Sequence, residues 1–154
     1  MCFADRDDND WWCISELNTQ TTEKGSTLYF LIINKRTWKC LDVIGRVMDD
    51  GQPIQQWTLH GGDNQLWQLQ RVEHNCFRIF SKHSGKCLDV PDGMKDDGVR
   101  VQQWSESTWF DGGINQQWIL EDLGDGSYAV KAKHSGKCLD SLPDTFASLF
   151  EINT

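Results

Sequence analysis

Two stretches of this sequence carry the same combination of a carboxylate, an indole and an amide side chain. The three groups occur in the same order in both: Asp42, Trp57 and Asn64, then Asp89, Trp104 and Asn115. A carboxylate accepts charge-assisted hydrogen bonds from two adjacent hydroxyls, an Asn amide donates and accepts, and an indole offers a flat apolar face. Together they suit a ring with hydroxyls on its edge and an apolar patch on one face.

A second pattern pairs histidine with cysteine, at His83 with Cys87 and at His134 with Cys138. One histidine and one thiol supply half of a zinc site, and no third or fourth ligand recurs with them. The MDDG and KDDG stretches lack the spaced oxygen ligands of a calcium loop. Glycoside hydrolysis needs two acids across a cleft, whereas each repeat supplies one Asp. We therefore predict no metal, no cofactor and no catalysis.

These side chains belong to an internal repeat. The octapeptide KHSGKCLD occurs unchanged at 82–89 and 133–140, and a third Cys-Leu-Asp triplet lies at 40–42. The recurrence of the triplet at these three places predicts a fold built from three similar units. An alternating apolar stretch with aromatic or β-branched residues, typical of a strand, precedes each triplet. Downstream, Asp50-Gly51 and Asp97-Gly98 supply the positive φ that a tight hairpin needs, so we predict about four strands per repeat.

The third repeat stops early, because no Trp-bearing strand follows Asp140. The segment DNDWWCISEL aligns with DNQLWQLQRV, which places Trp12 on Trp67. A missing strand would expose unpaired backbone groups, so we predict that the N-terminal strand completes the third repeat. The expected domain is 1–154, with repeats of about 28–75, 76–127, and 128–154 plus 8–18.

Composition limits the class of protein. The chain has 154 residues, 38% of them hydrophobic, and 8 Trp, which fits one compact domain. A net charge of −8 disfavours nucleic acid and anionic membranes as partners. No apolar run reaches membrane-spanning length, and the first ten residues lack the pattern of a secretory signal. We therefore expect no direct membrane insertion, and cytoplasmic location or leaderless secretion is favoured.

The cysteines indicate mostly reduced thiols. Cys40, Cys87 and Cys138 occupy the same place in each repeat, and equivalent positions of a symmetric fold lie far apart. Cys2, Cys13 and Cys76 share no such pattern. The alternative is a disulfide framework of a secreted protein.

Three repeats of this length with Cys-Leu-Asp, Gln-x-Trp and Asn-Gln-x-Trp resemble the ricin B-chain family (R-type lectins) over nearly the whole chain. The resemblance implies an all-β β-trefoil and one sugar pocket per repeat. It assigns the pockets to Asp42, Gln55, Trp57, Asn64 and Gln65, and to Asp89, Gln102, Trp104, Asn115 and Gln116.

The ligand that this resemblance implies is terminal galactose or N-acetylgalactosamine, on glycans, glycoproteins or glycolipids. An epimer with the wrong hydroxyl would leave the buried carboxylate unpaired. One shallow monosaccharide site binds in the millimolar range, about −4 kcal/mol. Avidity then requires several sites on one chain or a homodimer.

The third repeat predicts at most a weak site. Aligning Phe150 with Trp57 and Trp104 puts Ser148 at the Gln position, and Asn9 and Asp10 replace the Asn-Gln pair. Asp140 and Phe150 remain as sugar contacts, but Asp10 would add a second carboxylate beside Asp140. We therefore predict that this site is empty or far weaker than the other two.

Several other interpretations remain open. The recurring Trp12, Trp67 and Trp118 are expected in the core, whereas Trp38 and Trp109 are expected in loops, with Trp109 bordering the second pocket. The alternative functions are a xylan-type polysaccharide-binding module tethered to an enzyme, a trefoil protease inhibitor, and the targeting part of a toxin.

Overall fold

The computed structural model describes residues 10–17, 27–141 and 150–154. The described residues form thirteen strands joined by loops and four single 3-10 turns. The strands are β1 Trp12–Leu17, β2 Tyr29–Asn34, β3 Cys40–Val43, β4 Ile54–Trp57, β5 Trp67–Glu73, β6 Cys76–Ser81, β7 Cys87–Asp89, β8 Val99–Arg100, β9 Gln102–Trp104, β10 Trp118–Asp122, β11 Tyr128–Ala132, β12 Cys138–Ser141 and β13 Phe150–Asn153. The turns are η1 Ile44–Arg46, η2 Asp63–Gln65, η3 Pro91–Gly93 and η4 Ile114–Gln116. None of the helical segments in these ranges has the length or apolar character to cross a bilayer.

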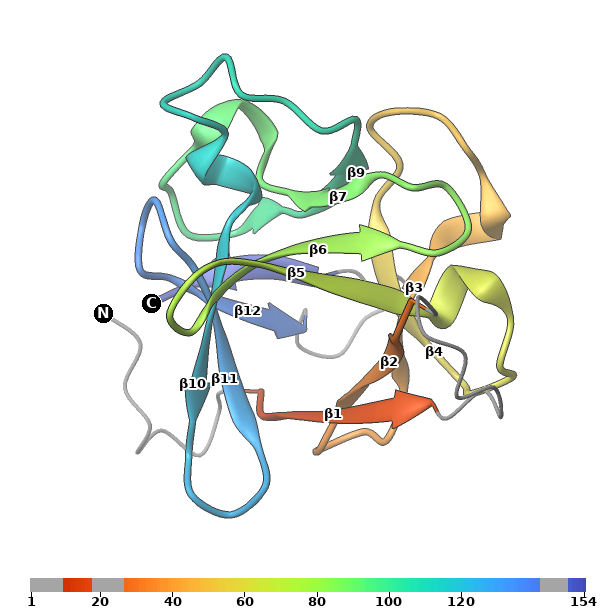
Figure 1. Cartoon of the computed structure of the whole chain (residues 1–154). Coiled ribbons are helices and arrows are strands. Elements are labelled where there is room, and N and C mark those ends of the chain that lie inside the picture. The colour runs from red at the N-terminus through yellow and green to blue at the C-terminus, as the bar shows by residue number, and fades with distance from the viewer. Residues whose placement is uncertain (1–9, 18–26, 142–149) are drawn as a thin grey trace.

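Six strands close into an antiparallel barrel. Their order is β1, β2, β5, β6, β10 and β11, and β1 pairs with both β2 and β11 to complete the ring. Figure 1 shows β1, in red, lying between β2 and the β10–β11 hairpin. The N-terminal strand therefore completes the third repeat, as predicted. The all-β, threefold β-trefoil is confirmed.

Three buried tryptophans mark the threefold symmetry of the core. Trp12, Trp67 and Trp118 are each 0% exposed, which confirms that they are structural. Each indole N–H donates to the Leu carbonyl of a Cys-Leu-Asp triplet: Trp12 to Leu139 at 3.4 Å, Trp67 to Leu41 at 3.0 Å and Trp118 to Leu88 at 2.9 Å. A buried indole needs such a partner, and these bonds fix the triplets against the barrel.

Outside the barrel, each triplet strand pairs with the strand that follows it. Asp42 lies opposite Gln55 in the β3–β4 pair, and Asp89 lies opposite Gln102 in the β7–β9 pair. Each Gln is on a strand whose last residue is the exposed Trp57 or Trp104. The short outer strand pairs therefore bring a carboxylate, an amide and an indole together.

The Asp-Gly pairs do not form the tight hairpins that the sequence predicted. Gly51 and Gly98 do adopt positive φ, at +86° and +81°. However, residues 44–53 form a long connection between β3 and β4, and the Gly51 N–H donates to the Gln103 carbonyl of the next repeat at 2.8 Å. The turn is long because it reaches across to pack on the neighbouring repeat.

The duplicated octapeptide holds successive repeats together. His83 contacts the carbonyl of Arg46, and His134 Nε2 lies 2.7 Å from the carbonyl of Met94. Lys86 pairs with Asp50 at 2.9 Å, and Lys137 pairs with Asp97 at 2.6 Å. Each copy thus binds the loop of the preceding repeat in the same way, and both histidines contact backbone carbonyls. Among the described residues, no group of three His, Cys, Asp or Glu is placed to hold a metal ion.

The cysteine prediction holds for two of the three triplets. Cys40 and Cys87 are buried and free, and burial raises the pKa of Cys40 to about 11 and that of Cys87 to about 12. Cys138 is disulfide-bonded, so the prediction that it is reduced was wrong. The symmetry argument spoke only against bonds between equivalent positions, and the equivalent Cys40 and Cys87 are free. The sixth cysteine, Cys2, lies outside the described residues.

Candidate functional site

The first pocket has a buried carboxylate on its floor. Asp42 on β3 is 1% exposed. Gln55 Nε2 donates to its Oδ1 at 3.0 Å. Asn64 Nδ2 and Gln65 Nε2 donate to its Oδ2 at 3.2 Å and 3.0 Å. Three amide donors thus fix the orientation of the carboxylate, and Oδ1 retains acceptor capacity for a ligand hydroxyl.

The second pocket repeats this geometry. Gln102 Nε2 donates to Asp89 Oδ1 at 2.9 Å, and Asn115 and Gln116 donate to Oδ2 at 3.2 Å and 3.0 Å. Asp89 is 3% exposed. Burial raises its pKa above the ordinary Asp value, partly offset by the hydrogen bonds from Gln102 and Gln116. The two floors are therefore alike in partners and in distances.

A 3-10 turn places the Asn-Gln pair in each repeat. In η2, Asn64 Nδ2 also donates to the Val43 carbonyl at 3.1 Å, which ties the turn to β3. In η4, Asn115 Nδ2 donates to the Val90 carbonyl at the same distance. The turns bring these amides beside the Asp because the following Trp enters the core and anchors the chain.

Gln65 and Gln116 hold the site together from behind. Both are 0% exposed. Gln65 Nε2 also donates to the Thr58 carbonyl at 2.9 Å, and its Oε1 accepts the His60 N–H at 2.9 Å. Gln116 makes the matching bonds to the Ser105 carbonyl and the Ser107 N–H, at 2.9 and 3.0 Å. With their amides fully used, these two residues position the carboxylate and do not face the cavity.

The tryptophans expected to stack on a ligand stand at the rims. Trp57 is 53% exposed and Trp104 is 40% exposed. Each forms one wall of a cavity whose other wall includes the Asp and the Asn. The first cavity is lined by Asp42, Arg46, Gln55, Trp57, His60 and Asn64 among others, and the second by Asp89, Asp92, Gln102, Trp104, Trp109 and Asn115 among others.

Some cavity residues did not emerge from the repeat pattern. Arg46 and His60 in the first pocket and Asp92 in the second lie in connections between strands, and the sequences of these connections differ between repeats. Trp109, 75% exposed, does border the second pocket, as its position in the sequence suggested. Repetition can reveal only what two pockets share, so it gave no signal for their differences.

A buried arginine also supports the second pocket alone. Arg78 on β6 is 7% exposed and donates to Gln116 Oε1 at 3.1 Å and to the Gly112 carbonyl at 2.8 Å. The strand registers match Phe80 with Ile33, so the counterpart of Arg78 in the first repeat is Leu31. An Arg within the apolar stretch CFRIF was the available sequence signal.

The alignment of Phe150 with Trp57 and Trp104 was wrong. Across β12–β13, Phe150 lies opposite Ser141 and Asn153 lies opposite Cys138. Phe150 is therefore the counterpart of the core residue Ile54. It is 0% exposed and packs edge-to-face on Trp12 with ring centroids 5.0 Å apart. Asn153 takes the position of the rim Trp. Ser148 and Asn9 lie outside the described residues.

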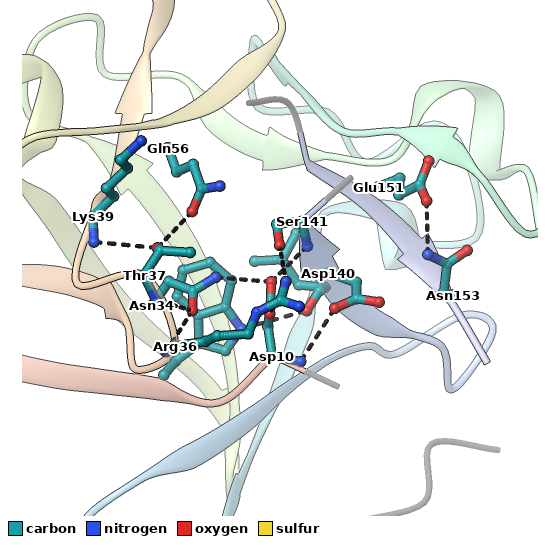
Figure 2. Close-up of polar contacts among 12 residues, drawn as sticks. Asp10, Asn34, Arg36, Thr37, Lys39, Gln56, Asp140, Ser141, Glu151 and Asn153 are labelled. Atoms are coloured by element: carbon teal, nitrogen blue, oxygen red, sulfur yellow. Dashed lines mark hydrogen bonds and ion pairs between the residues drawn. The ribbon is translucent and has the colours of Figure 1, made fainter. Parts of the chain in front are cut away.

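The third repeat gathers carboxylates where the other repeats place amides. Figure 2 shows Asp10 beside Asp140, whose Oδ1 accepts the Asp10 backbone N–H at 3.1 Å. Asp10 is paired with Arg36 at 2.9 Å and accepts a bond from Asn34 at 2.8 Å. Glu151 lies opposite Asp140, in the place of Gln55 and Gln102. Burial, and then the Asp10 charge, raise the pKa of Asp140 to about 6.

Comparison with solved structures supports the fold. A designed threefold-symmetric protein, ThreeFoil, is 39% identical, with a TM-score of 0.73, and the match covers 80% of this chain and 86% of that one. An exo-β-1,3-galactanase from Clostridium thermocellum is 33% identical, with a TM-score of 0.73, over 84% of this chain and 28% of the galactanase. A ricin B-like lectin of Macrolepiota procera, solved with lactose, is 18% identical, with a TM-score of 0.65, over 86% and 89%.

Comparison with curated proteins gives no match. The family described as ricin-type beta-trefoil lectin domain-like matches residues 8–104 and 64–147, which together span most of the sequence. The match includes both pockets and the N-terminal strand that closes the barrel. The chain therefore belongs to the ricin-type β-trefoil lectin family of carbohydrate-binding domains.

Proposed function

We propose that this protein binds terminal galactose or N-acetylgalactosamine through the first and second pockets, without chemical change to the sugar. The observation that carries the proposal is the pair of buried carboxylates, Asp42 and Asp89, each held by three amide donors beside an exposed tryptophan. A preorganised acceptor next to an aromatic platform is the arrangement that a sugar with a polar edge and an apolar face requires.

Selectivity follows from the cost of an unpaired carboxylate. A fixed, desolvated acceptor gains a charge-assisted hydrogen bond only from a hydroxyl in the right position. A sugar that stacks on Trp57 or Trp104 but presents the wrong epimer leaves the remaining acceptor position of the Asp Oδ1 without water or a hydroxyl partner. Galactose therefore binds and glucose does not, because the two differ in the orientation of one hydroxyl.

The first pocket also favours binding over hydrolysis. Retaining and inverting glycosidases place two carboxyl groups across the scissile bond. The first pocket has one carboxylate among its polar floor residues, and its three amide partners hold that group as an acceptor. The non-catalytic proposal rests on this donor set.

Tryptophan fluorescence tests the sugar specificity. Galactose should shift the emission, since Trp57 and Trp104 lose water from one ring face on stacking, whereas glucose at the same concentration should leave it unchanged. A glycan array on the isolated chain then identifies the preferred terminal sugar and linkage. An equal response to both monosaccharides, or to neither, contradicts the proposal.

A second candidate is a targeting module that brings an enzyme to a galactose-containing polysaccharide. The similarity to part of an exo-β-1,3-galactanase, at 33% identity, favours it. Polysaccharides with internal galactose on the array, bound better than terminal galactosides, would identify this function. Xylan included on the same array distinguishes a xylan-type module.

A further inference from the structure

The two pockets have similar floors but differ in the charged residue at their edges. In both, the segment after the Asp strand passes through two residues with positive φ: Gly45 and Arg46 in the first repeat, Asp92 and Gly93 in the second. The side chain thus comes from the second of these positions in one pocket and from the first in the other. The edge of the first pocket therefore carries a cation, Arg46, and the edge of the second carries an anion, Asp92.

Arg46 is exposed and lines the first pocket. Its φ of +55° is unfavourable for a residue with a side chain, and the contact of His83 with its carbonyl holds this conformation. Within the described part of the chain, no carboxylate lies within ion-pair distance of the Arg46 guanidinium. The ion pairs found there all involve other basic residues. The charge of Arg46 is therefore available to a ligand.

Three side chains converge around Gly62 at the edge of the first pocket. A Cβ at Gly62 would lie 2.7 Å from His60 Cε1, 2.9 Å from Arg46 Nη2 and 2.9 Å from Asn64 Oδ1. Only glycine leaves room for this approach. The guanidinium and the Asn amide oxygen thus border the same small space at Gly62, and the same Asn donates to Asp42.

Two further groups point to a ligand in this corner. Asn64 is 3% exposed, and its Oδ1 has no donor among the described residues. A buried acceptor without a partner is costly, and a ligand hydroxyl would satisfy it. His60 Nδ1 accepts the Gly62 N–H at 2.9 Å, which leaves Nε2 to donate, 3.6 Å from Asp42 Oδ2. The cationic group of the corner is Arg46.

The second pocket excludes this arrangement. A side chain at Gly93, the counterpart of Arg46, would meet Phe110, since a Cβ there would lie 2.5 Å from Phe110 Cε1. The loop that carries Phe110 also brings Trp109 to the cavity as a second aromatic wall. Asp92 adds a negative charge near Asp89. A neutral sugar with an extended apolar face fits this pocket better than an anion.

We propose that the first pocket selects a galactoside bearing an anionic substituent, a carboxylate or a sulfate, which Arg46 binds, whereas the second pocket takes neutral galactosides. The inference rests on the proposed function, since Asp42 must still hold the galactose ring. The planar guanidinium matches both anions with two parallel hydrogen bonds. The chain as a whole, with a net charge of −8, would otherwise repel such ligands.

Single-pocket variants test the proposal by calorimetry at low salt. Asp89→Ala leaves the first pocket and Asp42→Ala leaves the second. The probes are lactose, lactose with a sulfate ester on its galactose, and lactose whose galactose carries a sialic acid residue with its carboxylate. Asp89→Ala should bind at least one charged probe about tenfold more tightly than lactose, as expected for one charge-assisted pair, and should lose that preference at high salt. Asp42→Ala should show no such preference.

Arg46→Gly in the Asp89→Ala background isolates the charge. Glycine accepts the positive φ of this position without strain, so the fold is retained, and the ratio of charged-probe to lactose affinity should fall to about one. Arg71→Ala, an exposed cation on β5 outside the pocket, removes the same charge and should leave the ratio unchanged. The two charged probes distinguish sulfate from carboxylate.

Each outcome separates the two proposals. If Asp89→Ala binds lactose and both charged probes equally, the charge selection is wrong and the proposed function stands. If neither single-pocket variant binds lactose or any charged galactoside, the proposed function itself fails. If Arg71→Ala lowers the ratio as much as Arg46→Gly, the preference comes from overall charge and the assignment to Arg46 is overturned.

Discussion

Asp140 accepts a hydrogen bond from the backbone N–H of Asp10 at 3.1 Å, which joins the two ends of the chain in the third repeat. In the other repeats, Gln65 and Gln116 take the place of Asp10, and each donates its side-chain amide to the Asp of its own repeat. The substitution of Asp for Gln turns a donor into a second carboxylate. The chain therefore closes its barrel at a site whose charges disfavour a third sugar pocket.

The Asp10–Asp140 pair predicts an unusual pH dependence of stability. The pKa of Asp140 is raised from 3.8 to about 6 by burial and by Asp10, so the folded state holds this proton more tightly than the unfolded state. The contribution of Asp140 to stability is greatest at low pH and is lost as pH rises from about 4 to about 6. Asp140→Asn should therefore stabilise the protein by about 1–2 kcal/mol at pH 7.

Urea unfolding of both proteins at pH 4 and pH 7 checks this effect. The difference between Asp140→Asn and the wild type should shrink at pH 4, where Asp140 is protonated in the folded state and about half protonated in the unfolded state. A stabilisation that is the same at both pH values would show that the Asn side chain acts through packing and not through charge.

Arg78 should support the second pocket and not the first. Arg78→Leu copies the residue of the first repeat, Leu31, and leaves Gln116 Oε1 and the Gly112 carbonyl without this donor. The loss should destabilise the fold by about 1–3 kcal/mol and weaken galactose binding in an Asp42→Ala background. Calorimetry in the Asp89→Ala background is the control. An equal loss in both backgrounds would mean a general loosening of the fold.

Galactose binding by the second pocket should weaken as the pH falls. The loss should begin at a higher pH than the ordinary pKa of Asp would predict. Burial raises the pKa of Asp89, and the protonated carboxyl loses its charge-assisted bonds to the sugar. Titration of Asp42→Ala with galactose between pH 7 and pH 4 measures this decline. Affinity that stays constant across the range would mean that Asp89 is not the acceptor.

The cysteines should fall into two classes. Cys40 and Cys87 are buried, with pKa values raised to about 11 and about 12, so a thiol reagent should modify them only after unfolding. Cys138 should resist the reagent even in denaturant until a reductant is added, because it is disulfide-bonded. Peptide mass spectrometry with and without reductant reads both. Modification of Cys138 in the unreduced, unfolded chain would contradict the assignment.

The fold was predictable because every local signal repeats. The three core tryptophans recur at one position of the barrel, and the three Cys-Leu-Asp triplets recur at one position of the outer strands. The floors of the two pockets followed for the same reason. Two of the side chains that meet in each site, such as Asp42 and Gln55, face each other across one strand pair.

What the sequence could not provide lies where the repeats differ. The sequence between Asp140 and Phe150 is shorter than its counterparts in the other repeats, so the alignment had no anchor there, and Phe150 was placed three residues from its true register. Arg46 and Trp109 lie in connections between strands whose sequences differ between repeats, where no pattern predicts which side chain reaches the cavity. The long path of Asp50-Gly51 depends on contact with the next repeat, which local turn preference does not report.

Calorimetric titration with galactose measures how many pockets of one chain bind sugar. The wild type should bind two galactose molecules per chain, Asp42→Ala and Asp89→Ala should each bind one, and the double variant should bind none. Both substituted residues serve the pockets outside the apolar core, so circular dichroism should confirm that the variants fold. Unchanged stoichiometry in both single variants, or two bound galactose molecules in the double variant, would show that Asp42 and Asp89 do not form the sugar pockets.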